Sequence, residues 1–437
     1  MRLSVIGCGY LGAVHAACMA ELGHEVVGID LDESKVRSLS EGVAPFYEPG
    51  LPEVLRSALD SGRLRFSSDP ADARGARVHF IAVGTPQKSG SSAADMTYVD
   101  SAINALIPAL SPGDLVVGKS TVPVGTAQRL SATLRDAGTG ALLAWNPEFL
   151  REGFAIQDTI SPDRLVYGLP AGIDGETARA LMDEVYAAAL AAGTPLVPTD
   201  YATAELVKVS ANAFLATKIS FINAMAEIAE VTGADVTQLA DAIGHDVRIG
   251  RRFLNAGVGF GGGCLPKDIR AFSARADELG VGHSLGFLKE MDAINLRRRD
   301  RVVALALREL GAEFPRKKVA ALGLAFKPNS DDVRDSPALE IATRLAAEGT
   351  SVTATDPEAL RNAQRVQPQL TYTASIDDAL RGADLVIVAT EWVHFRELDP
   401  VIVRELVTTP TIIDARNCLD ADRWRAAGWT YIGLGRP

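Results

Sequence analysis

Three glycines near the amino end of the chain, Gly7, Gly9 and Gly12, constrain its fold more than any other feature. They follow the apolar segment "LSVI" and precede a segment of helical character, "AVHAACMAELGH". This G-x-G-x-x-G spacing between a strand and a helix is typical of a dinucleotide-binding domain. The glycines let the backbone turn sharply and approach a pyrophosphate, whose charge then faces the amino end of the helix. We therefore expect a nucleotide-binding α/β domain to begin here.

An acidic residue, Asp30, ends the next apolar segment, "EVVGID". At this place in such a domain a carboxylate accepts hydrogen bonds from ribose hydroxyls, which favours NAD over NADP. Lys35 and Arg37 follow closely, and a basic residue there could accommodate the 2′-phosphate of NADP. The alternative is a glycine turn that holds no dinucleotide. Cys8, inside the loop, is interpreted as a small apolar residue.

Further apolar segments cover residues 78–86, 114–126 and 141–150, with helical segments between them. This alternation predicts a doubly wound parallel sheet. The polar residues that end these segments are Thr85, Ser120, Thr121, Glu148 and Glu152. Ligands of such sheets bind beyond the carboxyl ends of the strands, so we expect these side chains at one site.

Residues 201–232 carry apolar side chains at helical spacing without proline or glycine, which predicts one long helix. Its many small residues suit close packing, so we expect it to link domains and to form the core of a dimer. Lys208 and Asn212 are four residues apart and share a helix face. The alternative for Lys208 is a solvated surface residue. The basic run at 295–301, "NLRRRDR", is interpreted as a solvated helix face.

A second α/β pattern follows "FPRKK", with the apolar segments "VAALGLAF", "SVTATD", "DLVIVAT" and "TIIDAR". It keeps only Gly323 of the glycine fingerprint, so it should bind a nucleotide differently. The predicted fold class is α/β, with two Rossmann-like doubly wound domains joined by a long central helix. The expected domains are an NAD-binding domain at 1–200, a central helical domain with dimer contacts at 201–300, and a second nucleotide-binding domain at 317–437.

A cysteine, Cys264, ends a stretch crowded with glycines, "NAGVGFGGGC". Pro266 favours the first turn of a helix, so the thiol is expected near a helix amino end. That positive end and Lys267 both favour the thiolate, and Asp268 projects from the same side one turn on. The alternative is a buried, inert cysteine. Beside a nicotinamide, however, a thiol can add to an aldehyde, and a second oxidation then gives a thioester that water hydrolyses to an acid.

The composition excludes several other classes of protein. A formal charge of -11 argues against general affinity for nucleic acid or anionic membranes. No apolar run is long enough to cross a bilayer, and the amino end lacks the features of a secretory signal, so we expect a cytoplasmic protein. The four scattered cysteines favour neither a disulfide framework nor a zinc site.

Together these motifs resemble the UDP-glucose 6-dehydrogenase family, a branch of the nucleotide-sugar dehydrogenases. The resemblance covers nearly the whole chain, through "GCGYLG", "VGTP", "STVPVGT", "NPEFLREG", "AELVKVSANAF", "DVRIGRRFLNAGVGFGGGCLPKD", "GLAFKPNSDDVRDSP" and "DAR" in the family's order. It implies oxidation of UDP-glucose to UDP-glucuronate with two NAD and one water, as a step toward polysaccharides or other glucuronate-containing products. The chain has "GGGC" where the family more often has "GGSC", which removes a hydroxyl but not the thiol.

The resemblance also implies roles for individual residues. Cys264 would be the nucleophile, and Lys208 with Asn212 would donate to the oxygen that becomes negative. The residues implied for the hydrolytic water are Glu148, Asp268 and Thr121. Those implied for NAD are Gly7, Gly9, Tyr10, Leu11, Gly12, Asp30, Lys35, Thr85, Thr121, Glu152, Lys267 and Arg334. Those implied for the substrate are Glu148, Phe149, Leu150, Arg151, Glu152, Lys208, Asn212, Arg248, Phe253, Leu254, Asn255, Ala256, Gly257, Gly261, Lys327 and Arg416.

Arg248 matches an arginine that reaches the neighbouring subunit's sugar site in related enzymes, which implies a homodimer. The third domain, without its own fingerprint, would take the uridine diphosphate end. Alternative substrates within the family are GDP-mannose and UDP-N-acetylmannosamine. Two rivals lie outside it. A 3-hydroxyacid dehydrogenase would not need the second α/β domain, and a non-catalytic nucleotide-sugar binding protein would not need Cys264, Lys208 and Asp268 together.

Overall fold

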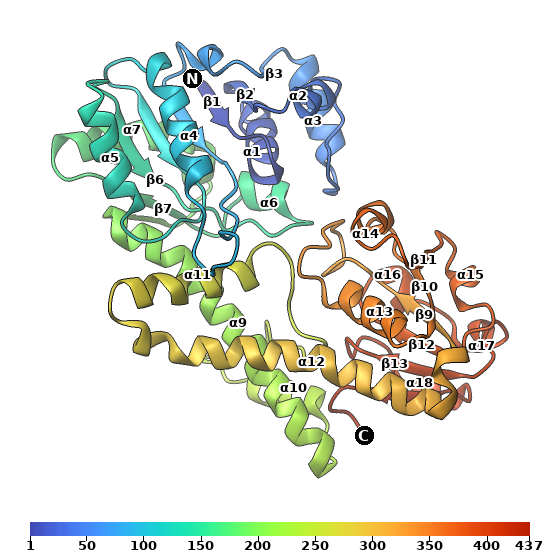
Figure 1. The fold of residues 1–437 in the computed structure, drawn as a ribbon. Helices are drawn as coiled ribbons and strands as arrows, with labels where there is room; N and C mark the ends of the chain where they lie inside the picture. Colours follow the sequence, from blue (N-terminus) through green and yellow to red (C-terminus); the bar gives the residue numbers. More distant parts are fainter. The chain divides into compact units, whose positions relative to one another are not determined.

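The computed structural model describes residues 1–437, and the chain divides into two compact units. The first unit comprises residues 1–211 and 274–280, and the second comprises 212–273 and 281–437. Figure 1 traces the chain from blue at the amino terminus to red at the carboxyl terminus. No helix of the structure is both long enough and apolar enough to span a bilayer.

The first unit is built on an eight-stranded sheet in the order β3-β2-β1-β4-β5-β6-β7-β8. Its first six strands are parallel and have the order of a doubly wound nucleotide-binding sheet. β7 pairs antiparallel to β6, and β8 runs parallel to β7. The strands are β1 (Arg2–Ile6), β2 (Glu25–Ile29), β3 (Leu64–Ser67), β4 (Val78–Ile81), β5 (Leu115–Gly118), β6 (Leu142–Trp145), β7 (Leu165–Gly168) and β8 (Leu196–Thr199).

Helices connect these strands and cover buried apolar side chains on the sheet. The central strands β4 and β5 are buried along their whole length, as expected of parallel strands covered on both faces. Their side chains are apolar apart from that of His79, which is also buried. The helices are α1 (Tyr10–Glu21), α2 (Glu33–Ser40), α3 (Leu51–Asp60), α4 (Thr97–Leu106), α5 (Thr126–Asp136), α6 (Ala155–Ile160), α7 (Ile173–Val185) and α8 (Ala187–Ala191), with 3₁₀ turns η1 (Pro70–Ala73) and η2 (Ile107–Ala109).

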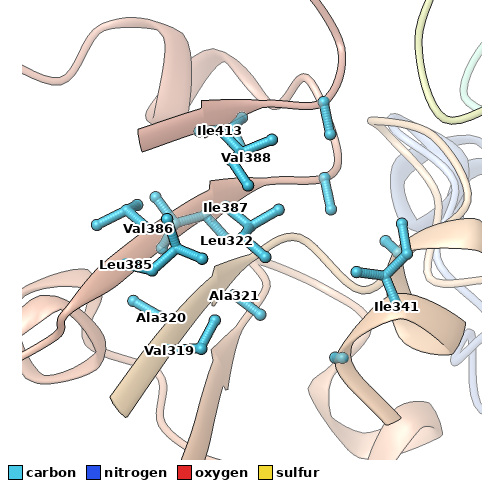
Figure 2. Packing of buried hydrophobic residues seen from close by; sticks show 14 of the residues in the cluster. Val319, Ala320, Ala321, Leu322, Ile341, Leu385, Val386, Ile387, Val388 and Ile413 are labelled. Carbon is cyan, nitrogen blue, oxygen red and sulfur yellow. The ribbon is translucent and has the colours of Figure 1, made fainter. Parts of the chain in front are cut away.

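The second unit holds a six-stranded parallel sheet in the order β11-β10-β9-β12-β13-β14. This repeats the order of the first six strands of the other unit, so the prediction of two Rossmann-like domains is confirmed. Its core packs β9 against β12, β13 and α13, as Figure 2 shows with Leu322, Ile387, Ile413 and Ile341. The strands are β9 (Lys318–Leu322), β10 (Ser351–Thr355), β11 (Thr371–Tyr372), β12 (Leu385–Val388), β13 (Thr411–Asp414) and β14 (Thr430–Gly433).

The long helix predicted for residues 201–232 is α9 (Tyr201–Thr232), which runs from the first unit into the second. α11 (Leu265–Glu278) also crosses the division. The other helices of the second unit are α10 (Val236–Gly244), α12 (Gly286–Leu310), α13 (Pro337–Ala347), α14 (Leu360–Val366), α15 (Ile376–Leu380), α16 (Val393–Arg396), α17 (Pro400–Arg404) and α18 (Ala421–Ala426), with η3 (Gly282–Leu285) and η4 (Gly311–Arg316).

The basic run at 295–301 lies on α12, where Arg297 and Asp300 are exposed, but its interpretation as a solvated face is wrong for Asn295, Arg298 and Arg299. Asn295 and Arg298 are 0% exposed and Arg299 is 2% exposed. Arg298 pairs with Glu230 of α9 at 3.3 Å. A buried guanidinium requires such partners, because its desolvation is costly without them. These side chains therefore face inward and hold other segments against α12.

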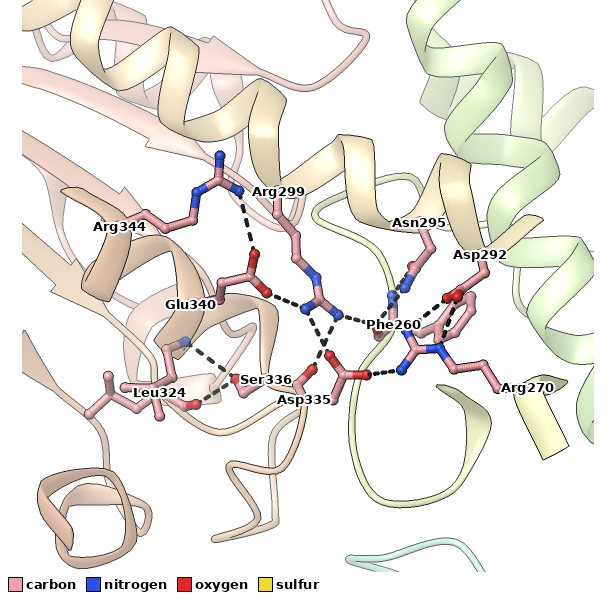
Figure 3. A network of polar contacts seen from close by, with 11 residues as sticks. Phe260, Arg270, Asp292, Asn295, Arg299, Leu324, Asp335, Ser336, Glu340 and Arg344 are labelled. Carbon is pink, nitrogen blue, oxygen red and sulfur yellow. Dashed lines mark hydrogen bonds and ion pairs between the residues drawn. The ribbon is translucent and has the colours of Figure 1, made fainter. Parts of the chain in front are cut away.

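The main segment held by α12 is the glycine-rich loop, residues 255–263. The amide of Asn295 accepts from the Phe260 N–H at 2.7 Å and donates to the Phe260 carbonyl at 3.0 Å. Arg299 donates to the same carbonyl at 3.3 Å, pairs with Asp335 at 2.8 Å and contacts Glu340, as Figure 3 shows. The loop is thus fixed between α12 and the segment that leads into α13.

A glycine is required where this loop crosses α12. Gly259 has φ +89°, and a Cβ there would overlap the side-chain oxygen of Asn295. The close approach lets Asn295 bond both backbone groups of the next residue. The glycines of the loop therefore allow backbone contact rather than flexibility at this point.

Asn295→Ala is expected to lower the free energy of unfolding by about 1–3 kcal/mol, because it leaves the buried Phe260 N–H without a partner. Leu296→Ala, at the adjacent exposed position of α12, is the control and should change it by less than about 0.5 kcal/mol. Chemical denaturation measures both. Equal midpoints for Asn295→Ala and the wild type would contradict the role assigned to this amide.

Candidate active site

The glycine loop after β1 forms an open cradle at the start of α1. Gly7 has φ +92°, and a Cβ at Gly12 would overlap the Gly7 carbonyl oxygen, so neither position accepts a side chain. Gly9 precedes α1 and has open space where a Cβ would stand, and no side chain caps the helix. A pyrophosphate fits such a cradle, because free amides and the positive helix end both face it. The residues present thus suit a dinucleotide.

Asp30 lies beside this cradle. Its carboxylate accepts from the Cys8 N–H at 2.8 Å and pairs with the Lys35 ammonium at 2.8 Å. Because Lys35 is paired with Asp30, the two together offer no net positive charge to a 2′-phosphate. Cys8 is buried, as expected for a small apolar residue, and burial raises the pKa of its thiol.

The segment after β6 carries the acidic part of the site in the first unit. Glu148 pairs with Lys208 of α9 at 2.9 Å and accepts from the Leu150 N–H at 2.6 Å. Both charged side chains are largely buried, at 13% and 7% exposure, which strengthens their attraction. The Lys208 ammonium also lies 5.6 Å from the centre of the Phe149 ring. Lys208 is therefore buried, which excludes the alternative interpretation of this lysine as a solvated surface residue.

Other residues predicted for the first unit lie in the same loops. The Thr85 hydroxyl, after β4, donates to the Thr121 carbonyl, after β5, at 2.8 Å. Arg151 is exposed and forms a bidentate pair with Asp158. Glu152 is half-buried. The ends of β4, β5 and β6 thus carry the polar residues that the sequence predicted there.

In the second unit, Cys264 immediately precedes α11 and is exposed. Its carbonyl accepts the Asp268 N–H at 2.9 Å, so the first turn of the helix begins at this residue. Asp268 is 2% exposed and accepts from the Asn212 amide of α9 at 2.6 Å. Lys267 pairs with the same carboxylate at 2.8 Å. Asp268 is therefore held rigidly, one turn along the helix from the thiol.

The loop from Phe253 to Gly257 leads into the glycine-rich segment. Phe253 is 40% exposed and has φ +66°, a left-handed conformation that is uncommon for a side chain of this size and often marks a functional site. Leu254 and Ala256 pack with α9 and α10, and the Gly257 N–H donates to Asn223 of α9 at 2.9 Å. The loop is thus anchored while Phe253 stays accessible.

Basic residues of the second unit surround the same loop. Arg416 donates to the carbonyls of Gly259, Phe326 and Ala389. The Gly262 N–H donates to the Arg334 carbonyl at 2.9 Å, and Gly261 packs against the backbone of Asp335. The remaining predicted positions are Lys327, over the Phe326 ring, Asn255, bonded to Arg251, and Arg248, which is exposed and paired with Asp246.

The sequence reasoning missed Glu48, which lies in the loop before α3. Its carboxylate is 2% exposed and accepts from the Gly153 N–H at 2.6 Å, the Ala155 N–H at 2.7 Å and the Tyr10 hydroxyl. It therefore ties the start of α1, in the glycine cradle, to the segment that follows Glu148. No local pattern marks it, because two of its partners lie more than 100 residues away.

Comparisons with known proteins agree with this arrangement. Models of the UDP-glucose/GDP-mannose dehydrogenase family match residues 1–190 (NAD binding domain), 202–297 (central domain) and 320–421 (UDP binding domain). A UDP-glucose 6-dehydrogenase of Rhizobium meliloti is 41% identical over 100% of both chains.

Two solved structures are similar over the whole chain. A UDP-glucose dehydrogenase from the hyperthermophilic archaeon Pyrobaculum islandicum has a TM-score of 0.89 and 38% identity, covering 100% of this chain and 98% of that one. A UDP-D-ManNAc dehydrogenase from Pyrococcus horikoshii has a TM-score of 0.87 and 26% identity, covering 100% and 99%.

Glu48→Gln is expected to destabilise the first unit by about 1–3 kcal/mol, because an amide cannot accept from all three donors. Since Tyr10 opens α1, we also expect NAD affinity to fall about tenfold. Glu53→Gln, at an exposed position of α3, is the matched control and should change neither quantity. Thermal unfolding and NAD titration test this, and unchanged NAD affinity in a destabilised Glu48→Gln would contradict the link to the cradle.

Proposed function

Because the chain belongs to the UDP-glucose/GDP-mannose dehydrogenase family, we propose that it oxidises UDP-glucose to UDP-glucuronate with two NAD and one water. It is an NAD-dependent dehydrogenase of nucleotide sugars. NAD, when bound, supplies the acceptor for the hydride of each oxidation. The residues proposed to hold it are those of the glycine cradle, Asp30, Lys35, Thr85, Thr121, Glu152, Lys267 and Arg334.

The observation that supports a four-electron reaction is the position of Cys264. Its thiol is exposed at the amino end of the 14-residue helix α11. The helix dipole favours the thiolate, which is the reactive form. An enzyme that stopped at the aldehyde would not need a nucleophile there.

In the proposed sequence, the first oxidation converts the C6 alcohol to an aldehyde. The Cys264 sulfur then bonds to the aldehyde carbon, giving a thiohemiacetal, and the second oxidation gives a thioester. Water attacks the thioester carbonyl, the carbon–sulfur bond breaks, and the acid and thiolate are released.

Lys208 and Asn212, one turn apart on α9, are proposed as donors to the oxygen that becomes negative in the thiol addition. Glu148, Asp268 and Thr121 are proposed to position or activate the water. The ion pair of Glu148 with Lys208, at 2.9 Å, supports this assignment, because it places the carboxylate beside one of the proposed donors.

The second Rossmann-like domain, which matches the UDP binding domain of the family, is proposed to hold the uridine diphosphate. Lys327 and Arg416 would contribute positive charge there, with the loop from Phe253 to Gly257 and Gly261 against the sugar. The segment Glu148–Glu152 is proposed to line the same substrate. Arg248 is exposed, which suits its proposed role in the neighbouring subunit of a homodimer. The division at 1–200, 201–300 and 317–437 likewise stays a prediction.

GDP-mannose and UDP-N-acetylmannosamine are the alternative substrates. The identity is higher to proteins named for UDP-glucose, at 41% and 38%, than to the structure named for UDP-D-ManNAc, at 26%. The three substrates share the thiol chemistry, so the sugar nucleotide must be tested separately. A screen of all three, followed by NADH absorbance, identifies the preferred one.

The purified enzyme is expected to form two NADH for each UDP-glucose consumed, because both oxidations occur before the acid is released. Limiting UDP-glucose with excess NAD, combined with chromatography of the product, measures this ratio. One NADH per sugar would rule out the four-electron reaction.

Cys264→Ser is expected to lower turnover by at least about 1,000-fold, because an alcohol is a far weaker nucleophile than a thiolate at neutral pH. NAD binding should persist, since the glycine cradle is unchanged. Cys418→Ser, which also removes a thiol from the second unit, is the control and should retain activity. Full turnover by Cys264→Ser would remove this thiol from the mechanism.

A further inference from the structure

A small cavity in the first unit is lined by Glu148 together with side chains that have no role in the reaction proposed above. They are His15 of α1, Lys119 after β5, Asn146 after β6 and Tyr186 after α7. The cavity measures about 40 Å³, and since one water needs about 10–15 Å³, it has room for water. Its wall is polar, which is the condition for water to stay inside.

Lys119 is a buried amine that no carboxylate contacts. Its ammonium lies 2.9 Å from the Asn146 side-chain oxygen and 3.2 Å from the Tyr186 hydroxyl, and the Phe80 and Tyr186 rings flank it. Burial lowers the pKa of Lys119 to about 8, with Glu148 opposing the shift and Lys208 adding to it. Near neutral pH this side chain can therefore both accept and release a proton.

His15 gives a second indication that the cavity holds water. It is 1% exposed, and its Nε2 atom has no hydrogen-bond partner in the protein. Burial, with Lys119 and His24 nearby, lowers the pKa of His15 well below its usual value, so the ring is neutral. A buried nitrogen of this kind normally bonds to water, and the adjoining cavity provides the room.

The cavity also reaches the surface. Its wall includes Asp158, Asp163 and Arg164, and Asp163 is exposed. Arg164 stacks on Phe149 at 3.8 Å, next to Glu148 in the chain. The charged groups that act on Lys119 are thus Glu148 and Lys208, and the cavity wall adds Asp158, Asp163 and Arg164.

We propose that this cavity is a water-filled proton path and that Lys119 is its relay, taking protons from Glu148 and passing them to solvent near Asp163. The inference rests on the proposed function, in which Glu148 acts on the hydrolytic water. As the water oxygen bonds to the thioester carbon, its O–H bond breaks and the proton passes to Glu148. A cavity water carries it to the neutral Lys119 amine, and the resulting ammonium loses it to solvent. Lys119 touches no substrate, so it acts only through Glu148.

The relay requires that Lys119 be replaceable without loss of the first oxidation. In Lys119→Met, which keeps the length but cannot take a proton, thioester hydrolysis should slow about 10-fold to 100-fold. The covalent intermediate on Cys264 should accumulate, as seen by intact-protein mass spectrometry. The rise of the hydrolysis rate near pH 8 should disappear, while the first NADH forms at an unchanged rate. Lys119→Arg, which is always protonated, should behave like Lys119→Met.

Several results would overturn the relay. Hydrolysis by Lys119→Met at the wild-type rate with the same pH profile would do so. Equal slowing of the first oxidation and of hydrolysis would also do so, because it indicates a structural role. If Lys119→Met does not fold, Tyr186→Phe tests the relay instead, because it keeps Lys119 and removes only the hydroxyl beside it. It should shift the pH profile of hydrolysis without changing the first oxidation, and an unshifted profile would count against the relay. A wild-type enzyme that makes one NADH refutes the proposed function instead.

A ligand-free measurement tests the protonation of Lys119 directly. The pKa of Lys119 is lower in the folded than in the unfolded chain, so folding releases a proton between the two values. The wild type should therefore gain thermal stability relative to Lys119→Met as pH rises from about 8 toward 10. A difference in Tm that stays constant over this range would show that Lys119 does not titrate there, and the relay would fail.

Discussion

The hydrogen bonds between the Asn295 amide and both backbone groups of Phe260 are the contact on which the cysteine side of the molecule depends. The glycine-rich loop has no regular secondary structure, so its buried N–H and C=O groups must find partners elsewhere. Asn223, Asn295 and Arg416 supply them from α9, α12 and the segment after β13. Without these partners the loop could not stay buried, and the start of α11, where Cys264 lies, would be held only by the contacts of its own first turn, such as Asp268 with Asn212.

The glycine-rich loop also explains why charged residues of α12 are buried. Arg299 bonds to Phe260 on one side and to Asp335 and Glu340 on the other, so one guanidinium joins the loop to the segment before α13. The sequence made this run look solvated, because its acidic partners lie 36 to 71 residues away along the chain. Helical charge patterns alone cannot show which charges have distant partners. The error concerned tertiary structure, while the helix itself was predicted correctly.

Local patterns did predict the features that are encoded locally. The strand–glycine–helix pattern around Gly7 fixed the fold class, and the polar residues after β4, β5 and β6 were expected at the strand ends. Glu48 and Lys119 could not be found in this way. The first is recognised by donors that are distant in sequence, at residues 10, 153 and 155, and the second by a cavity whose wall comes from several separate elements. Lys119 directly precedes the motif "STVPVGT", yet neither residue matches a local pattern of its own, since their roles arise from burial.

The two sheets share one strand order yet present different nucleotide sites, and a single carboxylate accounts for much of the difference. Asp356, after β10, occupies the place in the second sheet that Asp30 has in the first. It is 2% exposed and accepts from the Leu324 and Ala325 N–H groups and from the Trp392 indole. Asp356 thus takes two amides of the loop after β9, whereas Asp30 takes only the Cys8 N–H of the loop after β1. The second loop has fewer amides left for a phosphate, and the glycine cradle of the first domain stays open for a pyrophosphate.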